Sequence, residues 1–333
     1  FVYLVFYKNG RPIGVSFCQV KAFKADENIR DGMESEAPDP CFFDGLFRWM
    51  RRRFAGLVSA EILICGNMLL TGEHAFFINE NELSVQTFMP FLENALKEVA
   101  LDLERKGTRI PAILHKDIFQ KSENPVGHYL VNRGFVEFDI QPNMIFTIRP
   151  EWKNFDDYVE TMDKKYRTRT RRAFKKKDGL HLVEFSAENV RAQKSEFYEL
   201  YRAIAKNAGF NMVDLNPEYL PALKEELGHR CRFFGYFLEE KLVAFYSVIE
   251  NHGELEAHFL GYDHALNHDF QIYLNILYDI VRLGIEGGFR KITFARTALD
   301  IVDGHRDAGV MFGTAGFAGF VGGRFRCIGG GQR

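Results

Sequence analysis

The chain has 333 residues, of which 46% are hydrophobic, and its formal net charge at pH 7 is -2. This apolar content is sufficient for packed cores and excludes an intrinsically disordered protein, while the length allows two domains. A net charge so close to zero gives no global argument for nucleic acid or membrane binding, so an electrostatic partner requires a local patch. No apolar run reaches membrane-spanning length, and no signal peptide is recognisable.

The five cysteines are far apart in the sequence and include no Cys-x-x-Cys pair. This spacing favours a reduced, cytoplasmic setting and matches neither a zinc site nor a disulfide framework. The chain begins at Phe1, inside an apolar strand pattern and without Met. We therefore expect a fragment that lacks its true N-terminus.

The first half of the chain predicts a hairpin, a strand, a polar segment, a helix and another strand. The hairpin covers residues 1–20, because Asn9-Gly10 between alternating apolar runs is the strongest short hairpin signal. A loop follows at 24–40 and a helical piece at 42–54. A strand at 60–65, an amphipathic helix at 84–105 and a strand at 110–114 come next. The strands 136–140 and 144–148 end this half.

The second half begins with helices at 154–177, 192–208 and 217–227, with a strand at 180–185 between the first two. It then repeats the order of the first half. The strands 233–238, 241–249 and 255–262 precede the polar loop 263–269, a helix that stops at Gly287-Gly288, and the strand 291–295.

Two copies of one α/β unit, about 230 residues apart, explain this order, and a chance match of generic patterns is the alternative. The expected domains are 1–150 and 151–300. The tail 301–333 is rich in Gly and Phe, has no clear period and carries no predicted site.

Three segments resemble a known family: Lys165–Lys175, His258–Asp263 and Tyr273–Arg296. They are similar to the FemAB-like acyltransferases, and more closely to the bacterial predicted N-acyltransferases with two acyl-CoA N-acyltransferase (GNAT) folds. The resemblance covers roughly residues 1–300. It implies an α+β (mixed α/β) fold with two tandem GNAT-like domains, each a mostly antiparallel sheet flanked by helices.

The same resemblance implies an acyl donor and an amine acceptor. The usual GNAT phosphate signature is absent from the loops at 66–72 and 263–269. FemAB-like relatives take an aminoacyl group from tRNA. The donor is therefore left open between acyl-CoA, acyl carrier protein and aminoacyl-tRNA, each a co-substrate rather than a tightly bound cofactor.

Acyl transfer needs a base for the incoming ammonium and donors for the developing oxyanion. Glu256 and His258 fall on one face of the strand 255–262, and both can accept a proton. Tyr246, on the preceding strand, is the predicted general acid in the same pocket. The alternative is that Glu256 and His258 lie on a solvated or hydrogen-bonded sheet face.

The helix N-terminus after the strand 255–262 is a ready place for an anion. Residues around it are predicted to bind the donor, although packing of the tyrosine, helix capping by Asn267 or Asp269 and a structural salt bridge of the arginine are the alternatives. Asp263 suits an amine better than a phosphate. The predicted binding residues are Tyr262, Asn267, Gln271 and Arg296.

A basic helix is the strongest local electrostatic signal, with nine Lys or Arg between residues 164 and 177. Arg169 and Arg172 are its predicted binding residues. The helix could hold tRNA, an anionic surface or a carrier protein, and a solvated helix face is the alternative. His252, His258, His264 and His268 match no standard zinc spacing, so no metal is predicted.

In the first copy, Gly66, Asn67, Gly72, Glu73 and His74 occupy the place of a donor loop. That copy is either a second site or a scaffold. The sequence thus predicts a cytoplasmic N-acyltransferase that moves an acyl or aminoacyl group to an amine, with the second copy as the active one. The alternatives are a non-catalytic GNAT-fold binding protein and a tRNA- or membrane-associated module that acts through the basic helix 164–177.

Overall fold

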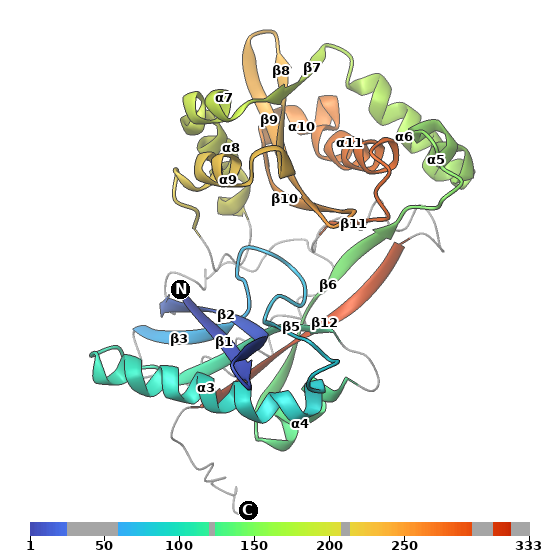
Figure 1. The fold of residues 1–333 in the computed structure, drawn as a ribbon. Coiled ribbons are helices and arrows are strands. Elements are labelled where there is room, and N and C mark those ends of the chain that lie inside the picture. Colours follow the sequence, from blue (N-terminus) through green and yellow to red (C-terminus); the bar gives the residue numbers. More distant parts are fainter. Residues whose placement is uncertain (25–58, 120–123, 208–213, 295–308, 321–333) are drawn as a thin grey trace, which may run out of the picture. The chain divides into compact units, whose positions relative to one another are not determined.

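A computed structural model of the chain describes residues 1–24, 59–119, 124–207, 214–294 and 309–320 (Figure 1). The chain divides into two compact units. Unit 1 contains Phe1–Gln141 and the C-terminal segment that starts at Gly313, and unit 2 contains Pro142–Phe312. The division falls inside a strand, shortly before the expected boundary at residue 150. Each unit is described by itself.

Unit 1 is built on a mixed sheet with the strand order β1-β2-β3-β5-β12, and β4 pairs with β2. The strands β1, β2 and β3 are antiparallel, β3 is parallel to β5, and β5 is antiparallel to β12. Its elements are β1 (Val2–Lys8), β2 (Arg11–Lys24), β3 (Ser59–Cys65), β4 (Phe76–Ile78), α3 (Val85–Arg105), β5 (Ala112–Phe119), α4 (Pro125–Asn132), the start of β6 (Val136–Thr147) and most of β12 (Gly309–Phe320).

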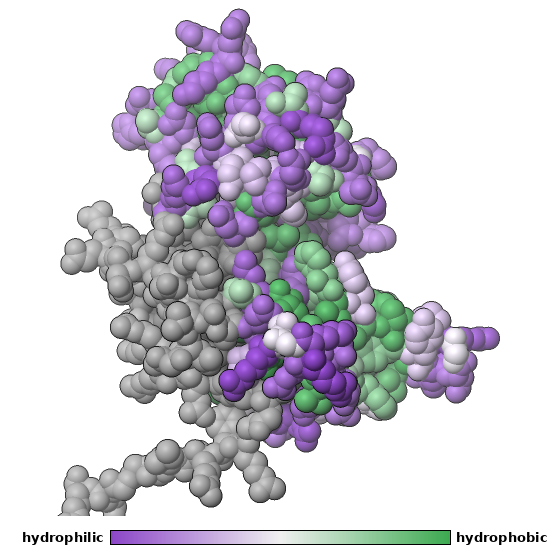
Figure 2. All heavy atoms as spheres, turned by 90° about the vertical axis from the view of Figure 1, so that its left-hand side faces the viewer, coloured by the Kyte–Doolittle hydropathy of each residue, from purple (hydrophilic) through white to green (hydrophobic). Residues whose placement is uncertain are grey.

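The hairpin of β1 and β2 forms where the sequence predicts it. Asn9 and Gly10 have φ of 51° and 77°, and these positive values suit the two-residue turns that match the twist of a hairpin. Apolar residues at alternate positions of β1, among them Tyr3, Val5 and Tyr7, are exposed. Figure 2 shows hydrophobic residues reaching the surface of this unit, in the lower half of the view.

The core of unit 1 lies between the sheet and α3. Ser84 begins the helix, and its side chain accepts a hydrogen bond from the Thr87 N–H. Phe88, Leu92 and Leu96 recur at helical spacing and are fully buried against residues of the sheet such as Leu63. The predicted amphipathic helix is therefore confirmed.

Unit 2 has a mixed sheet with the strand order β7-β8-β9-β10-β11-β6. Its strands are antiparallel except for β10 and β11, which are parallel. Its elements are the end of β6, α5 (Phe155–Thr161), α6 (Lys164–Lys176), β7 (Leu180–Phe185), α7 (Ala187–Ala192), α8 (Lys194–Asn207), α9 (Tyr219–Leu227), β8 (Cys231–Leu238), β9 (Lys241–Asn251), β10 (Glu254–Tyr262), α10 (His264–Phe270), α11 (Ile272–Glu286) and β11 (Lys291–Thr293).

Helices cover both faces of this sheet (Figure 1). The helices α5, α6 and α11 share one apolar core with alternate sheet residues such as Tyr246 and Leu255. The helices α7, α8 and α9 lie on the other face. There the backbone of α8 approaches β10 at Gly261, where a Cβ would lie 2.5 Å from the carbonyl carbon of Leu200. Glycine is therefore required for this close packing.

The structure corrects several predicted elements. The helix expected at 154–177 is broken at Met162, whose ψ of 148° is extended, so α5 and α6 are separate helices. The loop expected at 263–269 is mostly the helix α10. The two strands expected within 136–148 form the single strand β6. The tail expected to be irregular contributes β12, which pairs with β5. The helix expected at 42–54 lies outside the described residues.

Candidate active site

A β-bulge in β10 is the centre of the candidate site. Ala257 is paired with Val248 and Leu260 with Tyr246, so His258 and Phe259 together lie opposite the single residue Ser247. The Ser247 hydroxyl donates to the Phe259 carbonyl and accepts from the Phe259 N–H, both at 3.1 Å. Ser247 is buried, and it fixes the bulge by satisfying both backbone groups of Phe259.

The strands β10 and β11 part beside this bulge. Their parallel pairing ends at Glu256–Thr293, and the next residue, Phe294, donates its N–H to the Met144 carbonyl of β6 at 2.8 Å. On the other edge of β10, Asp263 N–H donates to the carbonyl of β9 residue 243 at 2.9 Å. Backbone groups alternate along an antiparallel strand. Those of residues 260 and 262 therefore point away from β9, towards the gap left by β11.

His258 forms a hydrogen-bonded pair with Tyr219 of α9. The distance between His258 Nε2 and Tyr219 Oη is 2.8 Å, and the ring of Phe259 packs against both side chains. Burial lowers the pKa of His258 to about 4, so the imidazole is neutral at neutral pH. Burial also raises the pKa of Tyr219, so the phenol keeps its proton. The pair is thus an uncharged, connected donor and acceptor.

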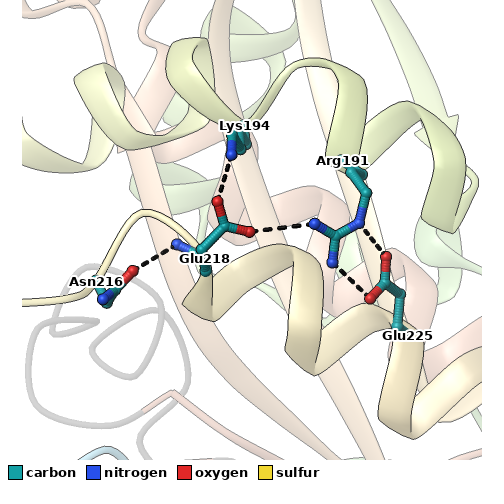
Figure 3. A network of polar contacts seen from close by, with 5 residues as sticks. All are labelled: Arg191, Lys194, Asn216, Glu218 and Glu225. Atoms are coloured by element: carbon teal, nitrogen blue, oxygen red, sulfur yellow. Dashed lines mark hydrogen bonds and ion pairs between the residues drawn. The ribbon is translucent and has the colours of Figure 1, made fainter.

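A charged network lies at the start of α9 (Figure 3). Tyr219 is the first residue of this helix. Arg191 of α7 binds both carboxylate oxygens of Glu225 and donates to Glu218 at 3.1 Å. Lys194 of α8 also donates to Glu218, the residue before Tyr219. The Glu218 N–H donates to Asn216 Oδ1 at 2.9 Å. These hydrogen bonds and ion pairs therefore connect α7, α8 and α9 next to Tyr219, the residue that pairs with His258.

Glu256 lies on the same face of β10 as His258, as the sequence predicts. Leu255 packs in the core with α11, so Glu256 points to the opposite face, and the bulge turns His258 and Phe259 to that face as well. Glu256 accepts a hydrogen bond from Asn251 Nδ2 at 3.1 Å. Because Glu256 is the last residue paired with β11, its carboxylate lies where the two strands part.

The structure does not bring Tyr246 to this site. Tyr246 is buried in the core on the α11 side, where it stacks on Phe234 at 5.0 Å between ring centroids, and burial raises its pKa. Tyr219 supplies the phenol beside His258 instead. Because the two residues are 39 positions apart on different elements, no local pattern in the sequence could have paired them.

The loop after β10 is filled by α10. Asp263 caps this helix by accepting from the Ala265 N–H at 3.0 Å, and Asn267 Oδ1 accepts from the Tyr273 N–H of α11 at 2.9 Å. Asn267 therefore acts as a helix cap in this structure. Gln271 has a left-handed backbone and joins the two helices. Tyr262 is partly buried beside them, and Arg296 lies outside the described residues.

The basic helix α6 is docked firmly against this region. Thr170 donates to Tyr278 Oη at 2.9 Å, and Asn275 Nδ2 donates to the Ala173 carbonyl at 3.0 Å. Lys177 follows the helix and forms an ion pair with the buried Asp279 of α11 at 2.6 Å. Arg172, by contrast, is exposed, and Arg169 is partly buried at the border of this packed face.

In unit 1 the corresponding gap, between β3 and β5, is closed by the protein itself. The parallel pairing ends at Cys65–His115, and the next two residues, Lys116 and Asp117, form a buried ion pair. Lys116 donates to the Leu70 carbonyl at 2.9 Å, and the Gly72 N–H donates to Asp117 at 3.1 Å. The loop predicted as a donor loop, with Gly66, Asn67, Gly72, Glu73 and His74, is therefore held by β5 side chains.

Within the residues that the structure describes, no cluster of three or more His, Cys, Asp or Glu is arranged to hold a metal ion. The described helices also include none that is long and apolar enough to cross a membrane.

Comparison with known proteins identifies the fold. Residues 164–301 match the family model described as acetyltransferase (GNAT) domain. The structure of FemX aligns with 12% identity, a TM-score of 0.55, and coverage of 95% of this chain and 87% of its own. A tandem GNAT protein from the clavulanic acid biosynthesis pathway aligns with 12% identity, a TM-score of 0.47, and coverage of 93% and 100%. No curated protein sequence matches the chain.

The FemX alignment covers nearly the whole chain, and the family model covers the part that contains the bulge, the His258–Tyr219 pair and the basic helix. At 12% identity the FemX likeness concerns the fold alone. It confirms the resemblance read from the sequence and the mixed α/β class. The chain has the FemAB-like GNAT fold, with two GNAT-like domains of which the second contains the matched acetyltransferase domain.

Proposed function

We propose that unit 2 is an N-acyltransferase, which moves an acyl or aminoacyl group from an activated donor to an amine. The donor is acyl-CoA, acyl carrier protein or aminoacyl-tRNA, and the reaction takes place in the cytoplasm, where these donors occur. The observation that carries the proposal is the bulged β10, which parts from β11 next to the His258–Tyr219 pair. The match of this region to a GNAT acetyltransferase domain supports it.

The donor carbonyl lies in the gap between β10 and β11. Backbone N–H groups that point into such a gap stabilise the oxyanion that forms during acyl transfer. In β10 these are the groups of Leu260 and Tyr262, which face away from β9. The Glu256 carboxylate, at the point where the strands part, binds the incoming ammonium.

His258 and Tyr219 move the proton. The bound ammonium first loses one proton to solvent. The resulting amine attacks the carbonyl carbon, forms the C–N bond and gives a second proton to Nδ1 of the neutral imidazole. Nε2–H then passes to Tyr219 Oη as the phenol gives its own proton to the leaving sulfur or oxygen, whose bond to carbon breaks. The 2.8 Å contact between His258 Nε2 and Tyr219 Oη permits this transfer. The imidazole gains one proton as it loses another, so a histidine with a pKa of about 4 does not have to become an imidazolium.

The test is the dependence of the rate on the leaving group. Tyr219→Phe should lower kcat about a hundredfold or more with an alkyl thioester or an aminoacyl ester, because the leaving group then departs unprotonated. With an aryl thioester, whose thiolate leaves readily, the loss should be much smaller. Tyr246→Phe is the matched control, since this phenol is in the core on the other face, and it should change kcat less than about threefold.

An equal loss with both kinds of donor would show that Tyr219 does not protonate the leaving group. Full activity of His258→Asn would contradict the proposed catalytic role of the His258–Tyr219 pair. A protein that binds donors, as measured by thermal shift, but turns over none of them with any amine would instead be a GNAT-fold binding protein.

A further inference from the structure

The N-terminus of α11 is unsuited to phosphate, although a helix N-terminus after β10 is where an anion is expected. The Tyr273 N–H is already bound by Asn267 Oδ1. Gln271 Oε1 and Asn275 Oδ1 are buried and have no hydrogen-bond partner among the described residues. The Asp263 carboxylate, which pairs with Lys241 at 3.5 Å, lies at the start of the same loop. Phosphate needs free donors, and this end of the helix offers acceptors instead.

A stripe of cations lies next to that loop, on α6. Lys165, Arg169, Arg172 and Lys176 are spaced by four, three and four residues, which places them on one side of an α-helix. We name these four residues the α6 stripe. No acidic residue occurs in the first turn of the helix to offset their charge.

Contacts fix the α6 stripe beside α10. Lys176 Nζ donates to the His268 carbonyl of α10 at 2.9 Å. One turn away from the stripe, the Ala173 carbonyl accepts from Asn275 of α11. The stripe is therefore part of the rigid body of unit 2, and its position relative to the loop after β10 is set by the fold.

Two members of the α6 stripe offer their charges to a ligand. Lys165 and Arg172 are exposed. Within the described part of the chain, neither these two residues nor Lys176 forms an ion pair with a carboxylate; the Lys165 ammonium lies over the ring of its neighbour Tyr166 at 5.5 Å. The exposed cations Lys165 and Arg172, held on one side of a docked helix, suit a ligand with several negative charges.

Aromatic side chains lie at the same loop. The ring of Tyr262 is 4.9 Å from that of His264 and 6.0 Å from that of Tyr273, between centroids. Tyr262 ends β10, and His264 is in the first turn of α10. Aromatic rings next to cations are the combination by which proteins hold a nucleotide, since bases stack and phosphates pair. A lipid surface would not require the aromatic group.

From these observations we infer that the α6 stripe binds the phosphate groups of an adenosine-bearing acyl donor, with Tyr262 beside its base. The inference rests on the proposed function, because it states where the donor of that reaction is held. Coenzyme A carries a phosphorylated adenosine diphosphate, and tRNA ends in adenosine on a phosphodiester chain. The chemistry shared by these two donors is adenosine phosphate.

The experiment measures binding of two donor fragments by isothermal titration calorimetry, with the whole chain. The first fragment is 3′-phosphoadenosine 5′-diphosphate, and the second is a short RNA hairpin that ends in CCA. The variant is Lys165→Glu with Arg172→Glu. Its control is Lys164→Glu with Arg171→Glu, which makes the same charge change at exposed residues of the same helix outside the stripe.

We expect the stripe variant to weaken binding of one or both fragments about tenfold or more, and to flatten the dependence of affinity on salt. The control variant should change affinity less than about threefold, since only general charge is altered. Weakening of the first fragment alone identifies coenzyme A as the source of the phosphate, and weakening of the hairpin alone identifies tRNA. Tyr262→Leu should weaken both nucleotide fragments and leave inorganic pyrophosphate unaffected.

Equal weakening by the two variants would overturn the inference, because it would show a diffuse charge effect. So would wild-type protein that binds vesicles of phosphatidylglycerol but neither fragment. His258→Asn separates this result from the proposed function. That variant should bind the fragments normally even if it is inactive. A failed activity test would therefore not contradict binding by the α6 stripe. A failed binding test would likewise not contradict the role of Tyr219 in protonating the leaving group.

Discussion

The two units share one arrangement of strands but differ in the residues that follow the point where a parallel strand pair separates. In both, a parallel pair of strands parts after a few residues: β3 from β5 at His115, and β10 from β11 at Glu256. In unit 1 the next residues of β5 are the ion pair Lys116–Asp117, which binds the neighbouring loop. In unit 2 the strand bulges and presents His258 to Tyr219. The first gap is filled by an ion pair, and the second lies beside a neutral hydrogen-bonded pair.

This difference explains why one copy of a repeated unit can be a scaffold. A buried ion pair is strongly coupled to its surroundings, because each charge would be costly without the other. A neutral pair of hydrogen-bonding groups can change its protonation pattern at little cost. Under the proposed function, the same topology supports stability in unit 1 and chemistry in unit 2, and substitutions can test that division.

The largest expected effect is in unit 1. Asp117→Asn keeps a residue that tolerates the positive φ of 54° but leaves the buried Lys116 ammonium without this carboxylate. We expect the free energy of unfolding to fall by about 3–5 kcal/mol, as measured by urea denaturation. Adding Lys116→Met should restore most of that loss. A cost below about 1 kcal/mol would show that the ion pair does not hold the gap closed.

The next effect is a pH dependence in unit 1. His115 is fully buried, neither ring nitrogen has a hydrogen-bond partner among the described residues, and burial lowers its pKa to about 4. The unfolded chain, with an ordinary histidine pKa near 6.5, binds more protons between these values, so stability falls as the pH drops.

His115 should therefore make the chain about 2 kcal/mol less stable at pH 5 than at pH 7, and His115→Phe should remove this contribution. Urea midpoints of the wild type and the variant at both pH values give the difference. In unit 2, His258→Asn should remove a smaller slope, because His258 is partly exposed and water screens its charge. Identical slopes in wild type and His115→Phe would contradict the buried, neutral state of His115.

A third effect compares two buried serines. Ser247 holds the bulge of β10, and Ser16 of β2 donates to the Ala75 carbonyl at 2.8 Å. Each change to Ala should cost about 1–2 kcal/mol, since a buried backbone group loses a partner. Only Ser247→Ala should also lower kcat, by about tenfold or more, because it displaces the reacting strand. If Ser16→Ala lowered kcat equally, the division between scaffold and active unit would fail.

The smallest effect comes from the surface network of unit 2. Arg191→Ala should loosen the start of α9 and lower kcat by about threefold, and added salt should imitate it in the wild type. Lys106→Ala, which breaks an exposed ion pair with Asp102 in unit 1, is the control and should leave kcat unchanged. Equal kinetics for Arg191→Ala and wild type would show that the network does not position Tyr219.

The sequence predicts most elements of both units because their signals are local. Alternation places Glu256 and His258 on one face of β10, and Asn9-Gly10 predicts the first hairpin. The sequence gives no signal for the break at Met162, because the residues on both sides of it continue a helical pattern. The sequence predicts Tyr246 at the site because it lies on the neighbouring strand, whereas in the structure alternation turns it into the core.

Other features depend on contacts between distant residues. The bulge requires the side chain of Ser247, and Tyr219 reaches His258 only when α9 packs on the sheet. The polar residues of α10 predict a loop, although Asp263 provides a helix cap there. The strand β12 has no amphipathic period, and its pairing with β5 is a property of the whole unit.

The pairing of β12 with β5 also has a consequence for synthesis on the ribosome. Phe320 is paired with Ala112, so the sheet of unit 1 gains this strand only after the whole of unit 2 has been translated. Until then β5 presents an edge with unpaired backbone groups, which is a site for incorrect pairing with other strands. Nascent chains usually fold from the N-terminus, domain by domain. In this chain, unit 1 emerges first from the ribosome, but its sheet is completed last, when β12 pairs with β5.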